Sequence, residues 1–461
     1  MPPDNRIRVL LIAEACNPTW TSVPLVGYRI ARSVAGRPDL DVTVVTHVRN
    51  RDAIATSDLA EHARVHYIDN EYVAAPAYRL ARLLRRGDEL GWTLATALHW
   101  PSYVVFELMA WHQFRDQLRR REFDLIHRVT PLSPTAVSPL ASRSPVPMIA
   151  GPLNGGLAWP KEYPELVAQE REWLVPLRRA YRFLPYHRST YRHLAGVISA
   201  SSATAAEVSG YFHGAHFNVP ENGIDDEAFP IAPRWREPDA RFCFVTTGRL
   251  VPYKGLSLTL EAIRSSPVLR SCELVVIGDG PDLPAHKAFV SEHGLDDCVT
   301  FIGNVAHDDV AHHLQHAQAF VFPSLREFGG AVVLEAMASA LPSIIVDYGG
   351  PTELLDERAG IKLPMRPRDE LVPLLRDAME RLATDHDLAR AMGDEAARHA
   401  PDHTWHARAE RYEQIYRDVL RAVPSPRART ANVTTAAALV GAAVLGAATR
   451  PARRMRRSRS G

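Results

Sequence analysis

The chain has 461 residues, which is too long for one ordinary domain, so we expect two. With 46% apolar and 23% charged residues, its composition is that of a soluble globular protein rather than a disordered chain. The net charge of +1 gives no basis for a nucleic-acid partner, because such a partner would call for an excess of basic residues.

The cysteines and the N-terminus both indicate a cytoplasmic protein. The N-terminal sequence MPPDNRIRVLLIAEA passes directly into a strand-like run, so no signal peptide is expected. Widely separated cysteines that form no metal-spaced pair suit a reducing compartment. The four are Cys16, Cys243, Cys272 and Cys298.

Short apolar runs rich in β-branched residues alternate with helical stretches along the first half of the chain. Such runs, separated by helices, are typical of parallel sheets that are covered on both faces. We expect strands at 8–13, 41–47, 64–69, 123–129, 147–152 and 196–201.

The same alternation is repeated in the second half of the chain. The expected strands are 241–248, 272–280, 298–303, 319–324 and 341–347. Two such sets in series predict an α/β fold of two doubly wound, Rossmann-like domains. Open parallel sheets bind ligands outside the carboxyl ends of their strands, so the two domains are expected to face each other across a cleft.

The boundary between the two domains is marked by a change in composition. Proline, acidic residues and turn formers cluster in FNVPENGIDDEAFPIAPRWREPDA. We therefore expect a first domain at 1–217, a linker at 218–240, a second domain at 241–403, a helix at 404–422 that returns to the first domain, and an Ala-rich and Arg-rich tail at 423–461.

Two basic residues follow the first strand of the second domain, in TTGRLVPYKG. Arg249 offers a planar fork and Lys254 a point charge, and both suit a diphosphate beside a helix start. Lysine at this position is informative because the chain has only four lysines, the others being Lys161, Lys287 and Lys362. The alternative is a surface loop with two solvated bases.

Glycines follow the strands of the second domain at three points. Gly248 ends the first strand, and Gly278 lies in VVIGDGPD after the second. Asn304 follows a third glycine in FIGNV. Glycine allows a ligand to approach the backbone closely, although each of these patterns is weak alone.

The stretch FPSLREFGGAVVLEAM carries two glutamates, Glu327 and Glu335, on either side of a glycine pair. Gly329 and Gly330 leave free amides at a helix start, which is a ready anion site. Glu335, about one turn into the helix, can accept two hydrogen bonds from a ribose diol, and Glu327 can do the same for a second sugar. The surrounding residues are too apolar for two solvated acids. The four patterns together predict a pocket for a nucleotide-sugar.

With these motifs the sequence resembles the retaining glycosyltransferases of family 4, which have the GT-B fold of two Rossmann-like domains. The resemblance covers roughly 240–400 and rests on GRLVPYKG, VIGDGP, FIGNV, REFGGAVVLEAMA and the linker sequence ENGID. It implies that Arg249 and Lys254 neutralise the donor diphosphate, that Glu335 holds the ribose and that Glu327 contacts the transferred sugar. It also implies that the amides around Phe328, Gly329 and Gly330 line the sugar and the phosphate.

The first half departs from the pattern of this family. The loop after the first strand is Gly-rich in many members, but here Gly27 is the only glycine in 14–31. Members often carry DxxHxH after the fourth strand, and here His127 is kept while Val129 replaces the second histidine. His127 is therefore either a contact to the sugar or the acceptor, or a structural histidine.

A second glycine-rich stretch of the first half, GPLNGG, follows the fifth expected strand. Its members Asn154, Gly155 and Gly156 are candidates for backbone contacts to the acceptor. A plain glycine turn is the alternative.

The expected activity is transfer of a hexose from a nucleotide-diphosphate sugar to an acceptor hydroxyl, in the synthesis of a glycan, glycolipid or cell-surface polysaccharide. Retention of configuration is implied by the resemblance alone. Alternatives are an epimerase or a phosphorylase of the same fold, or a non-catalytic partner subunit that binds the donor.

We expect no metal cofactor, because the fixed cations neutralise the diphosphate. The D-x-D sequence at Asp385 and Asp387 is interpreted as a helix N-cap.

Three segments raise the question of membrane contact. Residues 72–122 and 171–196 are helical, aromatic and arginine-rich, so they either lie at a membrane interface and admit a lipid-linked acceptor or form an enlarged acceptor domain. The run 431–449 is uncharged, but arginines flank it on both sides, against the positive-inside rule for a span. We expect the tail to lie on the inner face of the plasma membrane or to stay disordered.

Overall fold

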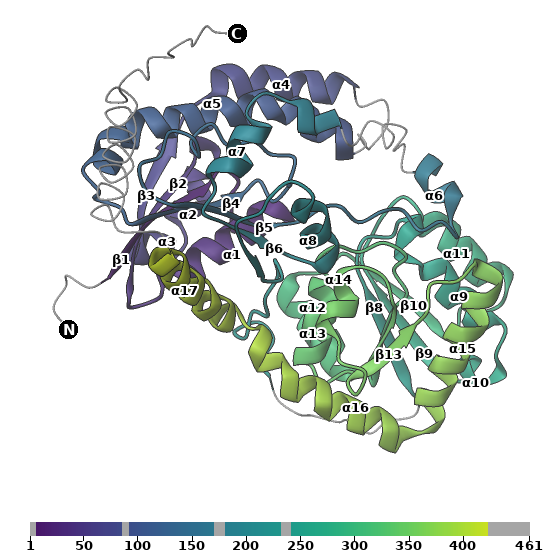
Figure 1. The fold of residues 1–461 in the computed structure, drawn as a ribbon. Coiled ribbons are helices and arrows are strands. Elements are labelled where there is room, and N and C mark those ends of the chain that lie inside the picture. Colours follow the sequence, from purple (N-terminus) through teal and green to yellow (C-terminus); the bar gives the residue numbers. More distant parts are fainter. Residues whose placement is uncertain (1–5, 85–91, 170–179, 232–240, 423–461) are drawn as a thin grey trace, which may run out of the picture.

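The computed structural model describes residues 6–84, 92–169, 180–231 and 241–422. The Ala-rich and Arg-rich tail lies outside the described residues, as do part of the expected linker and parts of the two arginine-rich segments. In the described part of the chain, two parallel sheets with helices on both faces form two lobes (Figure 1). The prediction of two doubly wound domains is confirmed.

The first lobe is built on a seven-stranded sheet in the order β3-β2-β1-β4-β5-β6-β7. Its strands are β1 (Ile7–Ala13), β2 (Leu40–His47), β3 (Arg64–Ile68), β4 (Leu125–Thr130), β5 (Met148–Leu153), β6 (Gly196–Ser199) and β7 (Ala215–Asn218). Its helices are α1 (Val23–Ala35), α2 (Arg51–Ala55), α3 (Leu59–His62), α4 (Glu71–Leu84), α5 (Trp92–Arg119), α7 (His187–His193) and α8 (Ser202–Ser209). A further helix, α6 (Pro164–Gln169), follows β5 in the chain but packs with the second lobe.

The second lobe is built on a six-stranded sheet in the order β10-β9-β8-β11-β12-β13, which is the strand order of a Rossmann fold. Its strands are β8 (Cys243–Thr247), β9 (Glu273–Ile277), β10 (Val299–Gly303), β11 (Ala319–Phe322), β12 (Ser343–Val346) and β13 (Gly360–Leu363). Its helices are α9 (Leu256–Arg264), α10 (Pro267–Arg270), α11 (Leu283–Glu292), α12 (His307–His316), α13 (Ala331–Ala338), α14 (Gly350–Leu354), α15 (Arg368–Thr384) and α16 (His386–His399).

Each sheet is buried on both faces because successive side chains of a strand point in opposite directions. On β11, Phe320 and Phe322 pack with α12 and α13, whereas Val321 packs with α9 and α15 on the other face. On β1, Leu10 and Ile12 likewise face the core that includes α5. Because helices cover both faces of each sheet, the strands need apolar residues at successive positions.

The last helix, α17 (Trp405–Ala422), leaves the second lobe and lies beside the first one (Figure 1). Its apolar residues recur at helical spacing, and Tyr412, Ile415, Tyr416 and Val419 are all buried in the core between α1 and the first sheet. Ion pairs from Arg37 to Glu410 and Glu413 support the same contact. Because α17 is covalently part of the second lobe and packed in the first, it ties the two lobes together.

Candidate functional site

The two predicted cations lie on the loop that leaves the carboxyl end of β8. Arg249 is exposed on this loop, and Lys254 ends the 3₁₀ helix η5 (Pro252–Lys254) directly before α9. Gly255 connects the two helices with a φ of 76°, and a Cβ atom there would lie 2.2 Å from the carbonyl oxygen of Pro323. Only glycine fits this crossing, so it holds the lysine loop against the loop that follows β11.

Lys254 and Glu327 form an ion pair between these two neighbouring loops. Both side chains are mostly buried, with 19% and 17% of their surfaces exposed. The ammonium nitrogen of Lys254 also lies 5.1 Å from the centre of the Phe322 ring, a cation–π contact. The sequence placed these residues on different groups of one ligand, and the structure adds that the two are direct partners.

The glycine pair after Glu327 forms the start of α13. Gly330 is the N-cap residue, with a φ of 61°, and the amides of the first turn follow it. Gly329 lies against the linker, because a Cβ atom there would be 2.3 Å from both the Glu221 carboxyl and the Asn222 side-chain amide. The turn therefore has no room for a side chain, and it leaves the backbone amides at the helix start.

Glu335 lies one turn into α13, and only 16% of its side chain is exposed. Burial raises the pKa of its carboxyl to about 7, and the charge of Asp225 acts in the same direction. In the described structure, His307 is the ionisable side chain that faces it, with Nε2 3.9 Å from Oε1. A buried carboxyl with no strong counter-charge is well suited to accept hydrogen bonds from neutral hydroxyls.

The other predicted donor residues surround these loops. Gly248 and Gly278 have φ values of 142° and 127°, and a Cβ atom at Gly278 would lie 2.0 Å from the carbonyl oxygen of Gly248. These glycines thus allow the ends of β8 and β9 to touch each other. Asn304 is exposed after the end of β10.

In the first lobe, His127 lies on β4 and is fully buried. Its Nε2 atom donates to the carbonyl oxygen of Gly151 at 2.7 Å, and its Nδ1 atom accepts from the Tyr416 hydroxyl at 2.6 Å. Burial lowers the pKa of the imidazole to about 4 against the effect of the Gly151 bond, so the ring is neutral. With both nitrogens bonded to protein, this geometry favours the structural alternative for His127.

Asn154, Gly155 and Gly156 begin a segment that we call the bridging segment, residues 154–169. The amide of Gly155 donates to the Thr204 hydroxyl at 3.1 Å, and a Cβ atom at Gly156 would lie 2.5 Å from the Glu207 carboxyl. α8 therefore fixes the start of this segment. Asn154 behaves differently, because its Oδ1 atom is buried with no hydrogen-bond partner in the described structure.

The bridging segment crosses to the second lobe beside the Lys254–Glu327 pair. The guanidinium of Arg326 stacks on the Trp159 ring at 4.2 Å and donates to the Leu157 carbonyl at 3.2 Å. Tyr348 donates to the Ala158 carbonyl at 2.9 Å. Figure 1 shows that α6, which ends the segment, lies against the second lobe. These contacts between the bridging segment and the second lobe could not be predicted from the sequence, because each joins residues that are far apart in the chain.

The structure adds Glu221 to the residues at the contact between the two lobes, which we call the seam. It lies in the linker, is 7% exposed, and has its Oε2 atom buried without a hydrogen-bond partner. Glu221 is the first residue of ENGID, and the sequence predicted no role for it. The one sequence feature that could have drawn attention to Glu221 is its position directly before the Asn-Gly pair of a turn.

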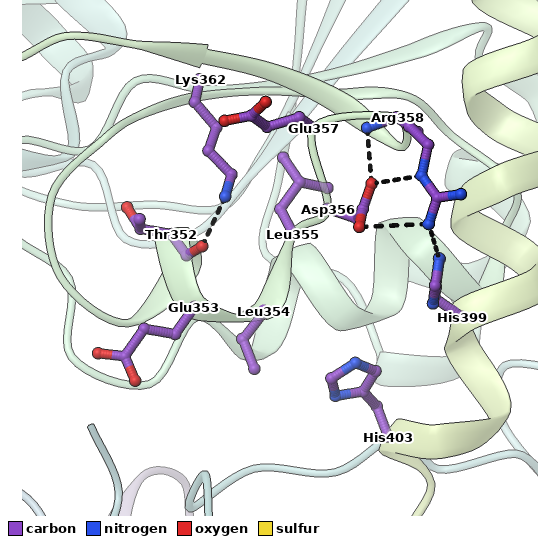
Figure 2. Close-up of a pocket in the computed structure, with 10 residues that line it drawn as sticks. All are labelled: Thr352, Glu353, Leu354, Leu355, Asp356, Glu357, Arg358, Lys362, His399 and His403. Carbon is purple, nitrogen blue, oxygen red and sulfur yellow. Dashed lines mark hydrogen bonds and ion pairs between the residues drawn. The ribbon is translucent and has the colours of Figure 1, made fainter. Parts of the chain in front are cut away.

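A separate pocket of about 600 Å³ lies on the second lobe between α14, β13 and the end of α16 (Figure 2). None of the predicted donor residues lines it. Its cations are occupied by neighbouring groups: Arg358 pairs with Asp356, and Lys362 donates to the Thr352 carbonyl at 2.9 Å. We therefore do not assign the donor to this pocket.

The D-x-D sequence lies at the start of α16. Asp385 is the N-cap residue and accepts from the amide of Leu388 at 2.9 Å, and Asp387 pairs with Arg390 on the same helix. The N-cap interpretation is confirmed. Within the described ranges, no three His, Cys, Asp or Glu side chains are grouped so that they could hold a metal ion. In the same part of the chain, every helix is too short or too polar to cross a membrane.

Comparison with known proteins gives the site a context. Residues 229–399 match the model of the family described as glycosyl transferases group 1. An alpha-D-kanosaminyltransferase of Streptomyces kanamyceticus is 30% identical over 184 residues, which are 39% of this chain and 47% of the relative. A GDP-mannose-dependent alpha-(1-6)-phosphatidylinositol monomannoside mannosyltransferase of Mycobacterium tuberculosis is 30% identical over 46% of this chain and 60% of the relative. The chain thus spans about half to three fifths of these relatives.

The structure resembles solved structures over a larger part of the chain. It matches sucrose-phosphate synthase from Thermosynechococcus elongatus with a TM-score of 0.61 and 20% identity, over 91% of this chain and all of that one. At this identity the similarity concerns the fold alone. The chain therefore has the GT-B fold, and its second lobe carries the region that matches glycosyl transferases of group 1.

Proposed function

We propose that the protein is a glycosyltransferase that moves a sugar from a nucleotide-diphosphate donor to an acceptor hydroxyl with retention of configuration. The observation that carries this proposal is the grouping of Lys254, Glu327 and Glu335 at the carboxyl edge of the second sheet, within the region that matches the family model. Ligands of such sheets bind at this edge. The named relatives are a kanosaminyltransferase and a mannosyltransferase, which supports a sugar donor.

The geometry supports a division of roles along the donor. Glu335 accepts hydrogen bonds from the ribose hydroxyls, since its carboxyl is buried and faces no strong cation. Lys254, Arg249 and the amides at the start of α13 face the diphosphate, whose negative charge increases as the bond to the sugar breaks. Positive groups that are already in place stabilise that charge without reorganisation. The reaction in this proposal needs no metal ion, because these groups neutralise the leaving group.

The ion pair gives Glu327 two roles in this proposal. It accepts hydrogen bonds from the transferred sugar and holds the Lys254 ammonium in place before the donor binds. Because the flexible lysine side chain is already held in one position, less conformational entropy is lost when the donor binds. The bridging segment, stacked on Arg326 beside this pair, limits access of water to the same edge.

The acceptor side is assigned to the first lobe. We propose a glycan or a lipid-linked sugar as the acceptor, because the cleft between the lobes is the place where both substrates can meet. His127 is not part of this assignment, since both of its ring nitrogens bind protein groups.

One observation favours a second candidate function, a partner subunit that binds the donor without turnover. The buried, neutral His127 and Val129 leave the end of β4 without a histidine that faces the cleft. Incubation with a panel of nucleotide-sugars separates the two functions. We expect slow release of the nucleoside diphosphate from one donor, and faster release with an acceptor. Binding without any release would support the subunit, and no binding at all would contradict both functions.

A further inference from the structure

A buried polar pair lies at the seam between the two lobes. Glu221 of the linker is 7% exposed, and the side-chain amide of Asn154 in the bridging segment is close enough to affect the pKa of its carboxyl. Each partner nevertheless keeps a buried oxygen, Oε2 of Glu221 and Oδ1 of Asn154, with no hydrogen-bond partner in the described part of the chain. Buried polar atoms are almost always hydrogen-bonded to protein or water, so these two oxygens can exchange hydrogen bonds with a ligand that reaches them.

The pair adjoins the donor edge of the second lobe. Glu221 Oε1 is the atom that a Cβ at Gly329 would meet at 2.3 Å, so the carboxyl lies directly against the glycine turn. The charge of Glu327 acts on Glu221, which places the two carboxyls near each other. Tyr412 of α17 is close enough for Glu221 to affect the pKa of its hydroxyl, and this hydroxyl is also buried without a partner.

The ionisation of Glu221 determines what the pair can bind. Burial raises the pKa of its carboxyl to about 7 against the opposing effect of the Asn154 amide, and the charge of Glu327 raises it further. A neutral carboxyl offers one O–H donor and an acceptor oxygen, and Asn154 Oδ1 offers another acceptor. This set matches sugar hydroxyls, each of which donates one hydrogen bond and accepts others.

We propose, on the basis of the glycosyltransferase function above, that Glu221 and Asn154 select donors by the charge of the transferred sugar. They hold hydroxyls of a neutral sugar ring and disfavour a ring that carries a carboxylate. A sugar carboxylate there would lose its hydration in a poorly solvated site. Glu221 offers it no positive charge, and the charges of Lys254 and Glu327 already offset each other.

The test compares three ligands that share one nucleotide: UDP, UDP-glucose and UDP-glucuronate, or the matching GDP, GDP-mannose and GDP-mannuronate set. Dissociation constants are measured by titration calorimetry on the full chain. Binding of the nucleoside diphosphate alone tests the donor site itself. We expect the neutral sugar to bind at least tenfold more tightly than the uronate. Equal affinity, with the nucleoside diphosphate still bound, would overturn the inference and leave the donor site intact.

Variants locate the preference at the pair. Glu221→Ala should weaken binding of the neutral nucleotide-sugar about tenfold and change the affinity for the nucleoside diphosphate by no more than about twofold. Glu221→Gln keeps the shape of the side chain and one hydrogen-bond donor, so its affinity for both ligands should stay within about threefold of the wild type. Asn154→Asp, which adds a negative charge, should widen the preference for the neutral sugar. Glu353→Gln is the matched control, because Glu353 also crosses between the lobes, to Ser202, away from the pair. An unchanged preference in Glu221→Ala, or an equal loss for all three ligands, would overturn the assignment.

Discussion

The two lobes have the same strand order over six strands, but their carboxyl edges are used differently. In the second lobe the loops after β8 and β11 bring Lys254 and Glu327 together, and α13 adds Glu335. In the first lobe the corresponding loops mainly form hydrogen bonds with one another. The carbonyl of Glu14, after β1, accepts hydrogen bonds at 3.2 Å from Thr46, near the end of β2, and at 2.9 Å from Asn50, just after β2.

The difference shows that the fold places loops, whereas the residues in those loops decide the chemistry. One edge presents a cation and two acids, which in our proposal bind a charged donor. The other edge is held together by internal hydrogen bonds, and burial raises the pKa of its Glu14 carboxyl to about 7. We therefore expect changes at the second edge to affect turnover and changes in the interior of the first lobe to affect stability.

The largest expected effect concerns Lys254. In our proposal Lys254 faces the leaving diphosphate. Replacing it with alanine removes that charge and takes away the ion-pair partner of Glu327, so turnover should fall roughly 10²-fold or more. Donor turnover under saturating conditions measures this. Lys287→Ala is the control, because Lys287 is exposed on α11 and contacts the Phe301 ring. Turnover of Lys254→Ala equal to that of the control would remove the pocket from the second edge.

His127 tests the opposite expectation for the first lobe. His127→Phe leaves the Tyr416 hydroxyl and the Gly151 carbonyl without their buried partner, so the free energy of unfolding should fall by roughly 2–4 kcal/mol. Urea unfolding measures this loss, and turnover per folded molecule should stay within about threefold. Tyr416→Phe should cost less, since it removes one hydroxyl. A loss of turnover in His127→Phe without a loss of stability would show that the histidine acts on the substrate.

The pKa of Glu335 predicts a pH dependence of stability. Its folded pKa is raised to about 7, above the ordinary 4.5, by burial and by Asp225. Below pH 4.5 the carboxyl is protonated in both states, so it contributes no penalty. Between pH 4.5 and 7 the unfolded state ionises first, and the folded state loses stability by up to about 3 kcal/mol.

Glu335→Gln keeps the neutral shape, so its stability relative to the wild type should rise from pH 5 to pH 8. Thermal unfolding across this range measures the difference, and Glu221 and Glu14 titrate equally in both proteins. A difference that does not change with pH would mean that the carboxyl is ionised when folded, with His307 as its partner. The same variant should bind nucleoside diphosphates more weakly, because an amide accepts fewer ribose hydrogen bonds.

The sequence was sufficient for most strands, including the edge strands β3 and β10, but it missed the last strand of each sheet. All eleven expected strands are present with shifted ends, whereas β7 (AHFN) and β13 (GIKL) were missed. Both missed strands are four residues long and lie at a sheet edge, so they lack the continuous apolar run of a central strand. Glu327 and Glu335 were found from their spacing, but the Lys254–Glu327 pair was not, because it joins two loops 73 residues apart.

The smallest expected effect concerns Asp385, which separates a helix cap from a metal ligand. Asp385→Ala removes the hydrogen bond to the Leu388 amide, so the free energy of unfolding should fall by about 1 kcal/mol. Asp385→Asn keeps an N-cap acceptor while removing the charge, so it should restore most of this stability. Turnover should be unchanged in both variants and in the presence of EDTA, because the proposed leaving-group charges are met by Lys254, Arg249 and the start of α13. If EDTA abolishes turnover and added Mg²⁺ restores it, the diphosphate depends on a metal ion, and the fixed cations are not sufficient.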